Sequence, residues 1–171
     1  MGKMARPSQV RACYFCALLQ AMSFTAVIPL LLVLQSGPTG PARGSFSVET
    51  GEEGRVQVNL QATLEPGWHL YALQLPREDG PLPTVIRLTS TAGHTGLLKV
   101  SEPEPVEEMD PNFAMLVRHH SGEPVFHAAT TRTSDAAFTL AGEVEYMLCN
   151  DRTCLPPVAV PFALEVPSAS K

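Results

Sequence analysis

The sequence predicts an all-β protein, an immunoglobulin-like β-sandwich preceded by an N-terminal export segment. After residue 43, short runs that alternate apolar and polar residues recur, turn-forming Gly, Pro and acidic residues separate them, and no segment keeps a helical period over about ten residues. Eight or nine such strands in about 129 residues have the spacing typical of two packed sheets. The composition, with 44% apolar and 17% charged residues in a chain of 171, suits one globular domain.

The first 42 residues have the layout of a secretory signal. Three cations and no acid lie within the first eleven residues, and an uncharged apolar stretch follows from Ala12 to Leu34. Gly40 and Ala42 are small residues spaced like a cleavage site, so we expect residues 1–42 to be a signal peptide and residues 43–171 to form the exported domain. The apolar stretch is also close to the ~20 residues that span a bilayer, which makes an uncleaved membrane anchor the alternative.

The strand pattern is clearest at three places. Residues 55–62 alternate strictly, residues 138–148 give two short runs, and residues 158–166 repeat the alternation with Val158, Val160, Phe162, Leu164 and Val166 inward. Pro161 marks this last run as an edge strand, because proline cannot donate to a ladder. The other strand candidates, in chain order, are SFSVE, WHLYAL, TVIRLTS, GLLKV, AMLVRHH and PVFHAATT. In AMLVRHH, we expect the neighbouring His119 and His120 to point to opposite faces.

The charge balance excludes several classes of partner. Residues 43–171 hold nine Lys and Arg against seventeen Asp and Glu, a formal charge of −8, which suits neither a phosphate backbone nor an anionic lipid surface. We expect the acidic, Pro-containing stretch 101–110 to be a solvated loop, with an acidic docking patch as the alternative. The sequence carries no motif for hydrolytic catalysis or phosphate binding. We therefore expect no cofactor and no nucleic-acid partner, and a membrane contact only if the N-terminal segment is retained.

Two of the four cysteines remain for the exported domain. Cys13 and Cys16 lie in the apolar stretch, which leaves Cys149 and Cys154 as an even pair, as expected for a disulfide in an oxidising compartment. The pair flanks the turn sequence NDRT, so facing strands would bring the two Cα atoms to about 4.4–6.8 Å. The two-residue period of a strand puts Cys149 on the face of Met147, pointing away from the neighbouring apolar row.

On the residues alone, the role of this pair stays open. A structural staple that closes so small a ring would contribute only about 2 kcal/mol, against about 4.7 kcal/mol for a 100-residue loop. A redox centre needs access for an attacking thiolate, which a pair at a solvent edge would provide. A metal clip has less support, because the five histidines lack the spacing of a zinc site, although Met147 and Cys149 with a histidine could hold copper(I).

Three stretches, in this order along the chain, resemble the amino-terminal domain of the thiol:disulfide interchange protein DsbD. They are PGWHLYALQLPREDGPLPT (66–84), DPNFAMLVRHHSGEPVF (110–126) and GEVEYMLCNDRTCLPP (142–157). The last is the most specific, because its cysteine pair follows a strand and precedes a Pro-Pro step. The resemblance implies an immunoglobulin-like fold in the bacterial periplasm, with a cysteine pair that relays electrons.

The resemblance also implies roles for five residues of this chain. Cys149 and Cys154 match the redox pair, and Cys154 matches the cysteine that bonds the partner in mixed disulfides. Phe113 matches a cap-loop aromatic that shields the disulfide, and His69 and Tyr71 match two aromatic positions beside it. The sequence departs from the best-known members at His69, where they carry tyrosine, and in having four residues rather than five between the cysteines.

The function implied is that of a periplasmic protein-disulfide reductase without a cofactor. In the family, the domain receives electrons from a thioredoxin-like partner fed by a membrane electron-transfer protein, and it passes them to substrates such as disulfide isomerases and cytochrome c maturation thioredoxins. Because the sequence carries one domain, we expect the electrons to come from another polypeptide. The competing hypothesis is a non-redox β-sandwich interaction module with a structural disulfide, and the reducibility of the bridge separates the two.

Overall fold

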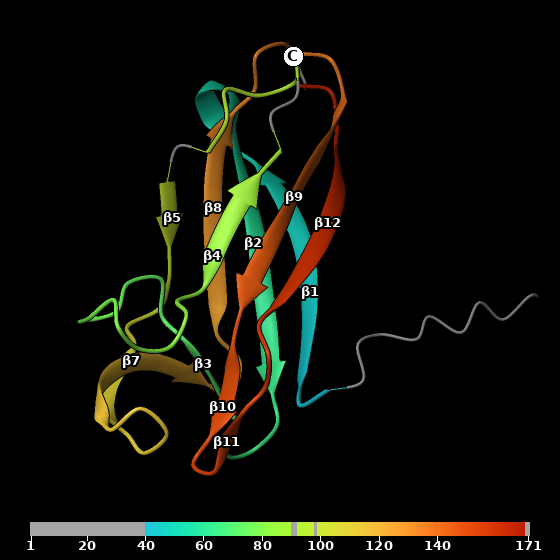
Figure 1. The fold of residues 1–171 in the computed structure, drawn as a ribbon. Helices are drawn as coiled ribbons and strands as arrows, with labels where there is room; N and C mark the ends of the chain where they lie inside the picture. The colour runs from blue at the N-terminus through green and yellow to red at the C-terminus, as the bar shows by residue number, and fades with distance from the viewer. Residues whose placement is uncertain (1–39, 90–91, 98, 170–171) are drawn as a thin grey trace, which may run out of the picture. The chain divides into compact units, whose positions relative to one another are not determined.

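The computed structural model describes residues 40–89, 92–97 and 99–169, and these form strands joined by turns (Figure 1). A single 3-10 turn, η1 (Glu52–Gly54), interrupts the strand order of the described part. None of the described residues forms a helix long and apolar enough to cross a membrane. The strands are β1 (Ala42–Thr50), β2 (Arg55–Leu64), β3 (His69–Tyr71), β4 (Val85–Leu88), β5 (Lys99–Ser101), β6 (Val106–Asp110), β7 (Met115–Ser121), β8 (Val125–Thr131), β9 (Phe138–Tyr146), β10 (Leu148–Asn150), β11 (Thr153–Cys154) and β12 (Val158–Val166).

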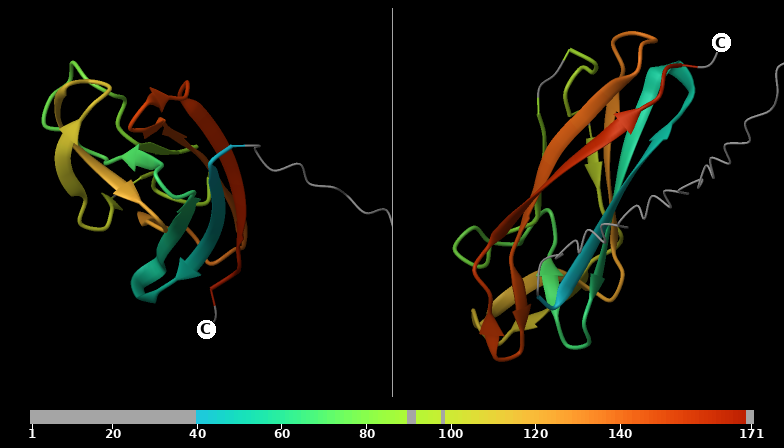
Figure 2. Two further views of the ribbon diagram at one scale, coloured as in Figure 1. Left: turned by 90° about the horizontal axis from the view of Figure 1, so that it is seen from below. Right: turned by 90° about the vertical axis from the view of Figure 1, so that its right-hand side faces the viewer.

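The described strands pair into three antiparallel sheets. The β2 sheet has the order β1-β2-β8-β5, the β9 sheet has the order β12-β9-β4, and the cysteine sheet has the order β11-β10-β3-β7-β6. The β2 sheet and the β9 sheet form two layers, with β1 beside β12 at one edge (Figures 1 and 2). The cysteine sheet lies at one end of these layers, where β9 passes through Met147 into β10. This arrangement confirms the predicted immunoglobulin-like sandwich.

The main core fills the space between the two layers. The inward positions of β2, Val56, Val58 and Leu60, meet Leu140 of β9 and Phe162 of β12 in one apolar cluster. Burial of such side chains is the dominant favourable term in folding, at roughly 25 cal/mol per Å² of apolar surface. The alternation of apolar residues predicted for residues 55–62 therefore packs as expected.

The predicted strand over 158–166 is β12, with the same bounds. It is an edge strand of the β9 sheet, as Pro161 indicates, because its other side has no ladder partner among the described residues. Phe162 and Val166 are buried, but Val158 at the start of the strand is 45% exposed. The predicted inward face of this strand is therefore correct, except that Val158 is exposed to solvent.

The acidic stretch 101–110 is not a loop throughout, contrary to the expectation from its composition. Residues Val106–Asp110 form β6, the edge strand of the cysteine sheet, and pair with β7. An edge strand that pairs on one side tolerates outward charges, and such charges protect it from pairing with another chain. The glutamates and prolines of this stretch have the composition of a loop, and the stretch has no alternating hydrophobic pattern that would predict a strand.

The predicted signal peptide lies outside the described residues, except for Gly40, Pro41 and Ala42. Ala42 is the first residue of β1, pairs with Leu64 and is buried in the main core. Cleavage after Ala42 therefore stays a prediction, and it would remove the first pair of the β1–β2 ladder.

Candidate functional site

Cys149 and Cys154 form a disulfide bond across a tight turn. They are direct partners in the β10–β11 ladder, and their Cα atoms lie 4.0 Å apart, slightly closer than the predicted range. The side chain of Asn150 shapes the turn, because its Oδ1 accepts hydrogen bonds from the backbone N–H groups of Arg152 (2.9 Å) and Thr153 (3.0 Å). The turn predicted from the sequence NDRT is therefore present.

The two cysteines differ in their exposure to solvent. Cys149 is 0% exposed, whereas Cys154 is partly exposed. Cys149 does share its face with Met147, as the strand period predicts, but this face is covered rather than open to solvent. The expectation of a freely accessible pair at a solvent edge is therefore wrong for Cys149. A second apolar cluster, the site cluster, covers it; its members are Tyr71, Leu75, Phe113, Met115, Val117, Met147, Cys149 and Cys154.

The end of the β6–β7 hairpin bends over this face. Tyr71 of β3 pairs with His119 on one side of β7, and Asp110 of β6 pairs with Met115 on the other side. Their partners are four residues apart along β7, so a flat sheet would keep Tyr71 and Asp110 well separated. Yet the Tyr71 hydroxyl donates a 2.6 Å hydrogen bond to Asp110 Oδ2. Only a strongly curved hairpin brings the two together, and β7 is visibly curved in Figure 1.

Asp110 anchors the loop that carries Phe113, and it was not predicted as a site residue. Its Oδ1 accepts the backbone N–H groups of Asn112 (2.7 Å) and Phe113 (3.3 Å), while Oδ2 accepts the Tyr71 hydroxyl. The Phe113 ring stands edge-on to Tyr71, with 6.2 Å between ring centroids. The Asp-Pro-Asn run was the sequence signal for this turn, since Asp side chains commonly bond the backbone two residues on.

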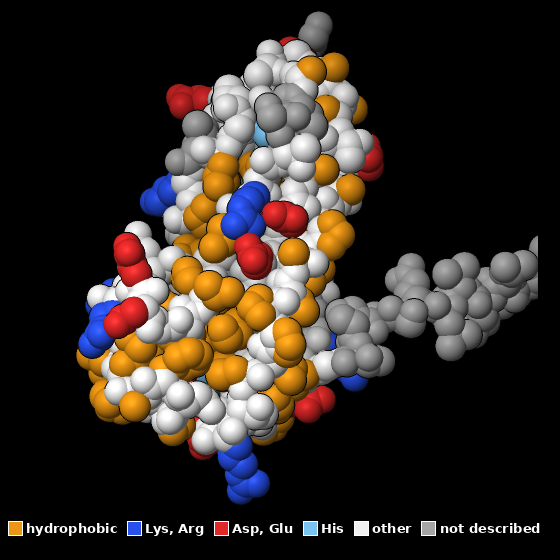
Figure 3. Space-filling model, viewed as in Figure 1, with side chains coloured by type: hydrophobic (Ala, Val, Ile, Leu, Met, Phe, Trp, Pro, Cys, Tyr) orange, Lys and Arg blue, Asp and Glu red, His pale blue; other side chains and the backbone are white. Residues whose placement is uncertain are grey.

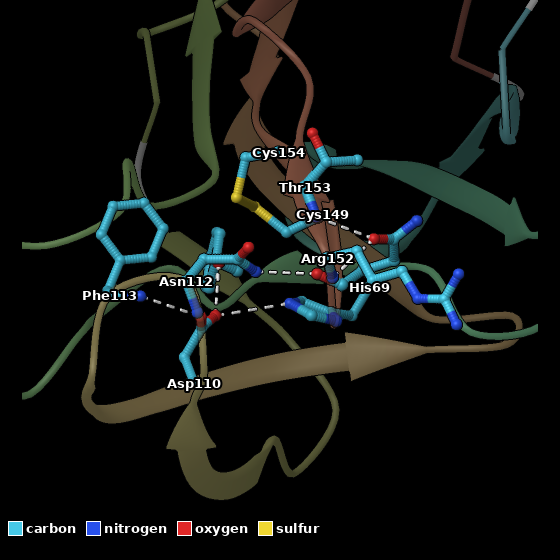
Figure 4. The surroundings of a disulfide bond; sticks show 10 residues. His69, Asp110, Asn112, Phe113, Cys149, Arg152, Thr153 and Cys154 are labelled. Carbon is cyan, nitrogen blue, oxygen red and sulfur yellow. Dashed lines mark hydrogen bonds and ion pairs between the residues drawn. A yellow bond between two sulfur atoms is a disulfide. The ribbon is translucent and has the colours of Figure 1, made fainter.

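A hydrogen bond joins this cap loop, residues 111–114, to the cysteine turn (Figure 4). The Asn112 side-chain amide donates to the backbone carbonyl of Asn150 over 2.7 Å. Ala114, at the end of the loop, has a φ of 51°, a value that is uncommon for a non-glycine residue. The loop is thus held at both Asp110 and Asn150, which places Phe113 against the site cluster.

Burial and hydrogen bonding set the charge of the two groups beneath the loop. Burial raises the pKa of Tyr71, and its hydrogen bond to Asp110 raises it further, so the phenol stays protonated. Burial also acts to raise the pKa of Asp110, but the hydrogen bonds from Tyr71, Asn112 and Phe113 outweigh it and lower the pKa below its ordinary value. Asp110 is therefore an ionised carboxylate at neutral pH although it is only 2% exposed.

His69 lies directly opposite Cys149 in the β3–β10 ladder. It is 7% exposed, and its Nε2 lies 3.6 Å from Asp110 Oδ2. Its ring contacts the His119 ring, with 4.6 Å between centroids, and His119 Nε2 lies 2.7 Å from Glu108 Oε1. Burial lowers the pKa of His69, and the neighbouring His119 lowers it further.

The predicted separation of His119 and His120 is confirmed. His119 faces His69 and Glu108, whereas His120 stands edge-on to Phe126 of the main core and lies 3.0 Å from Glu102 Oε2. Within the described residues, no group of three or more His, Cys, Asp or Glu side chains is arranged to hold a metal ion. The sulfur atoms of both described cysteines are engaged with each other.

Apolar side chains are exposed around this end of the domain. Figure 3 shows hydrophobic side chains gathered over its lower half, where the cysteine sheet lies in the same view. The large exposed hydrophobic residues of the cysteine sheet include Met109 and Leu116, which are partners in the β6–β7 ladder. Successive strand residues point to opposite faces, so Met109 and Leu116 lie on the face of the cysteine sheet opposite to Met115 and Val117.

Comparison with known proteins assigns the chain to a family. The profile described as "Thiol:disulfide interchange protein DsbD, N-terminal" matches residues 39–165. The chain belongs to this family. The family is described as part of a thiol:disulfide interchange protein, and in this chain Cys149 and Cys154 form a disulfide. No curated protein matches the chain.

Two solved structures resemble this DsbD N-terminal family member. The N-terminal periplasmic domain of ScsB from Proteus mirabilis aligns with a TM-score of 0.53 and 19% identity, over 74% of this chain and 48% of the other. The chain therefore spans about half the length of that ScsB structure. The reduced DsbD N-terminal domain of Neisseria meningitidis aligns with a TM-score of 0.49 and 16% identity, over 73% of this chain and 86% of the other. At 19% identity, the ScsB likeness supports the fold.

The structure brings together the residues that the sequence singled out. Cys149, Cys154, Phe113 and His69 lie on one face of the cysteine sheet and the loop above it (Figure 4). Tyr71 belongs to the same site cluster and stands edge-on to His69. The sequence reasoning missed the residues that hold them, namely Asp110, Asn112, Glu108 and His119. Only the Asp-Pro-Asn turn gave a signal, because the other contacts depend on the bend of the hairpin.

Proposed function

We propose that this protein is a periplasmic thiol–disulfide exchange protein of the protein-disulfide reductase type that relays electrons through Cys149 and Cys154. The observation that carries the proposal is the unequal exposure of the two cysteines. Exchange requires that one sulfur be reachable by a partner's thiolate while the other resolves the mixed disulfide. A partly exposed Cys154 and a buried Cys149 divide these two tasks.

The exchange step balances without a cofactor. A partner thiolate attacks the Cys154 sulfur, a new intermolecular disulfide forms, and the Cys149–Cys154 bond breaks with its electron pair leaving on Cys149. The partner's second thiol then attacks its own sulfur in the mixed disulfide and releases Cys154. The net result is transfer of two electrons and two protons to the cysteine pair, while the partner dithiol becomes a disulfide. The reverse sequence passes the electrons on.

Phe113, Tyr71 and His69 are proposed as neighbours that control access to the pair. Phe113 acts as a cap, because it packs on the site cluster from a loop that the structure ties to Asp110 and to Asn150. Tyr71 holds Asp110, and His69 lies across the ladder from Cys149. A large apolar side chain in a polar turn is otherwise unexpected, so a shielding role explains its position.

The proposed partners are thioredoxin-like periplasmic proteins. The exposed apolar residues of the cysteine sheet offer another protein a surface, and the family description supports thiol–disulfide interchange. We propose that electrons arrive from a membrane electron-transfer protein in trans and leave to substrates that include disulfide isomerases and cytochrome c maturation thioredoxins. The ScsB domain that the chain resembles is described as periplasmic, which supports the same compartment here.

Trapping the mixed disulfide tests this proposal. In Cys149→Ala the remaining Cys154 thiolate can attack the disulfide of a partner, and Cys149 is no longer there to resolve the mixed disulfide, so a covalent adduct with a thioredoxin-like protein should accumulate on non-reducing gels. In Cys154→Ala the remaining thiol is buried and should give no adduct. The two variants are each other's matched control, since both lose the same bridge. Each should lose only about 2 kcal/mol of stability, the value for a small ring, and should remain folded.

The reduction potential of the bridge separates this proposal from a structural disulfide. A relay pair equilibrates with dithiothreitol or glutathione buffers in the thioredoxin range, whereas structural bridges usually lie below about −300 mV. Absence of an adduct with either variant, together with a bridge that resists reduction, would leave the non-redox interaction module as the better account.

A further inference from the structure

Two buried histidines beside Cys149 take no part in the exchange step described above. His69 is the cross-strand partner of Cys149, so both side chains lie on the same face of the cysteine sheet. Directly opposite residues of an antiparallel pair have Cβ atoms about 4.5–5.5 Å apart. This register makes the side chains of His69 and Cys149 neighbours on that face.

Each of these histidines has a buried ring nitrogen that forms no hydrogen bond, although His69 Nε2 lies 3.6 Å from the Asp110 carboxylate. The two atoms are His69 Nε2 and His119 Nδ1. The other titratable groups that face His69 are engaged: both oxygens of Asp110 accept hydrogen bonds, and the Tyr71 phenol donates to it. Unpaired buried polar atoms cost free energy and are rare, so each one calls for an explanation.

A route leads from these rings to solvent. The rings of His69 and His119 are in contact, at 4.6 Å between centroids. His119 Nε2 lies 2.7 Å from Oε1 of Glu108, whose side chain is 58% exposed. The row from Cys149 through His69 and His119 thus ends at a solvated carboxylate on the edge strand β6.

We propose that His69 is the general base that accepts the proton of the Cys149 thiol when this cysteine resolves a mixed disulfide at Cys154, and that His119 and Glu108 pass the proton to solvent. This inference rests on the proposed exchange function and assigns a step within it. It applies to a residue at which this chain differs from the tyrosine expected from the resemblance.

The step balances in atoms and electrons. The Cys149 S–H bond breaks and its proton moves to a ring nitrogen of His69. The Cys149 thiolate then attacks the Cys154 sulfur, forming the Cys149–Cys154 bond and breaking the bond between Cys154 and the partner. The partner's sulfur leaves with the electron pair and takes a proton from water. Two cysteine thiols of this protein have then been oxidised, and the disulfide of a thioredoxin-like protein has been reduced.

The burial of the site explains why such a base is needed. The thiolate is the nucleophile, and apolar surroundings raise the pKa of a buried cysteine, so few Cys149 thiols would ionise unaided. Burial and His119 lower the pKa of His69, while Asp110 and Glu108 act in the opposite direction. The lowered pKa leaves the ring neutral, and hence able to accept a proton, at neutral pH.

Separating adduct formation from adduct resolution tests the proposal. The reduced full-length protein is mixed with oxidised glutathione, quenched with acid at successive times, and the glutathione adduct at Cys154 is followed by mass spectrometry. For His69→Tyr we expect adduct formation within about twofold of the unchanged protein and resolution slower by at least about tenfold at neutral pH, since a general base contributes 10²–10⁴-fold. The deficit should shrink at high pH, where the thiol ionises by itself.

His127→Gln is the matched control, because His127 lies on the β2 sheet and bonds Asn59, away from the cysteine sheet. It should leave both steps unchanged. Equal resolution rates and pH profiles in His69→Tyr and the unchanged protein would overturn the role of His69 and leave the exchange function intact. Failure of the unchanged protein to form any adduct at Cys154 would instead overturn the exchange function.

A second measurement needs no variant and so does not depend on how a substitution folds. NMR of the unchanged protein can follow the imidazole of His69 against pH in the oxidised and reduced forms. If the neutral His69 ring accepts a hydrogen bond from the Cys149 thiol, protonation of the ring breaks that bond, so the His69 titration should move to lower pH in the reduced form, while that of His127 stays in place. An identical His69 titration in both forms would overturn the proposal.

Discussion

The Asn112 side-chain amide donates a 2.7 Å hydrogen bond to the backbone carbonyl of Asn150, a residue 38 positions further along the chain. Asn150 also shapes the cysteine turn through its own side chain. The same residue therefore organises the turn and receives the cap loop. Any movement of the loop away from the disulfide has to break this bond.

Replacing Asn112 with alanine should make the disulfide easier to reach. We expect Asn112→Ala to be reduced several-fold faster by dithiothreitol, since the loop then loses one of its two attachments, with a stability loss of only about 0.5–1.5 kcal/mol. Stopped-flow reduction kinetics measure the first effect and urea unfolding the second. Asn59→Ala is the control, because it removes a comparable 2.7 Å bond to Glu49 on the β2 sheet. An equal acceleration in both variants would contradict the role of the loop.

Phe113→Ala should also accelerate reduction while leaving the fold in place. The Phe113 ring is only partly buried and packs on the site cluster, so its loss opens a path to the sulfur atoms without emptying the main core. Phe126→Ala is the contrasting variant, because Phe126 is buried in the main core and should cost about 3–5 kcal/mol. Unchanged reduction kinetics in Phe113→Ala, or a stability loss as large as that of Phe126→Ala, would identify Phe113 as ordinary packing.

Asp110→Asn should destabilise the domain in a pH-dependent way. The folded pKa of Asp110 is lowered from 3.8, so its contribution is present above this value and is lost as pH falls through the folded pKa. At neutral pH the variant should unfold about 1–3 kcal/mol more easily, because the hydroxyl of Tyr71 and two backbone N–H groups lose a charged acceptor. The difference should narrow in acid. A gap that stays constant down to low pH would show that the charge of Asp110 is not what matters.

His69 should make the protein less stable in mild acid. Its folded pKa lies below the ordinary 6.5, so the unfolded chain binds the proton first, and stability falls as pH drops from 6.5 towards the folded pKa. Urea unfolding across about pH 7.5 to about pH 5 should show this decline. In His69→Tyr the decline should be smaller, whereas His127→Gln should retain it. A decline of the same size in His69→Tyr would assign it to other groups.

The export segment yields a prediction at the chain terminus. We expect a signal peptidase to cut after Ala42, leaving Arg43 as the first residue of the mature protein. Intact-mass measurement on a periplasmic fraction checks this directly. A mature chain that retains Ala42, which is buried in β1, would move the cleavage site upstream, and recovery of residues 12–34 would favour the membrane anchor.

The sequence predicted the sandwich well because its evidence is local. Strands such as β2 and β12 each carry an alternating pattern whose inward face packs in the main core. β6 escaped prediction because its acids and flanking prolines resemble a loop, and only its pairing with β7 makes it a strand. Local patterns do not encode a partner that lies on the neighbouring strand.

The sequence predicted which residues form the candidate site, but it did not predict that Cys149 is buried. The family resemblance supplied Cys149, Cys154, Phe113, Tyr71 and His69, but the strand period alone suggested an open sulfur. The bend of the β6–β7 hairpin closes that face, and it also brings Asp110 to Tyr71. Such a bend depends on contacts between residues about 40 positions apart, and a short window of sequence carries no trace of it.

Leu148 and Cys149 are neighbours in β10, yet Leu148 packs in the main core and Cys149 in the site cluster. Successive strand residues point to opposite faces, so a register slip of one position would put a leucine in the site and a sulfur atom in the core. Gene variants that add a single codon between β9 and β10 should therefore turn the cysteine pair away from the site cluster, even with every site residue retained. Insertion of two codons keeps the parity of the strand, and we expect added length at this junction to be tolerated in steps of two.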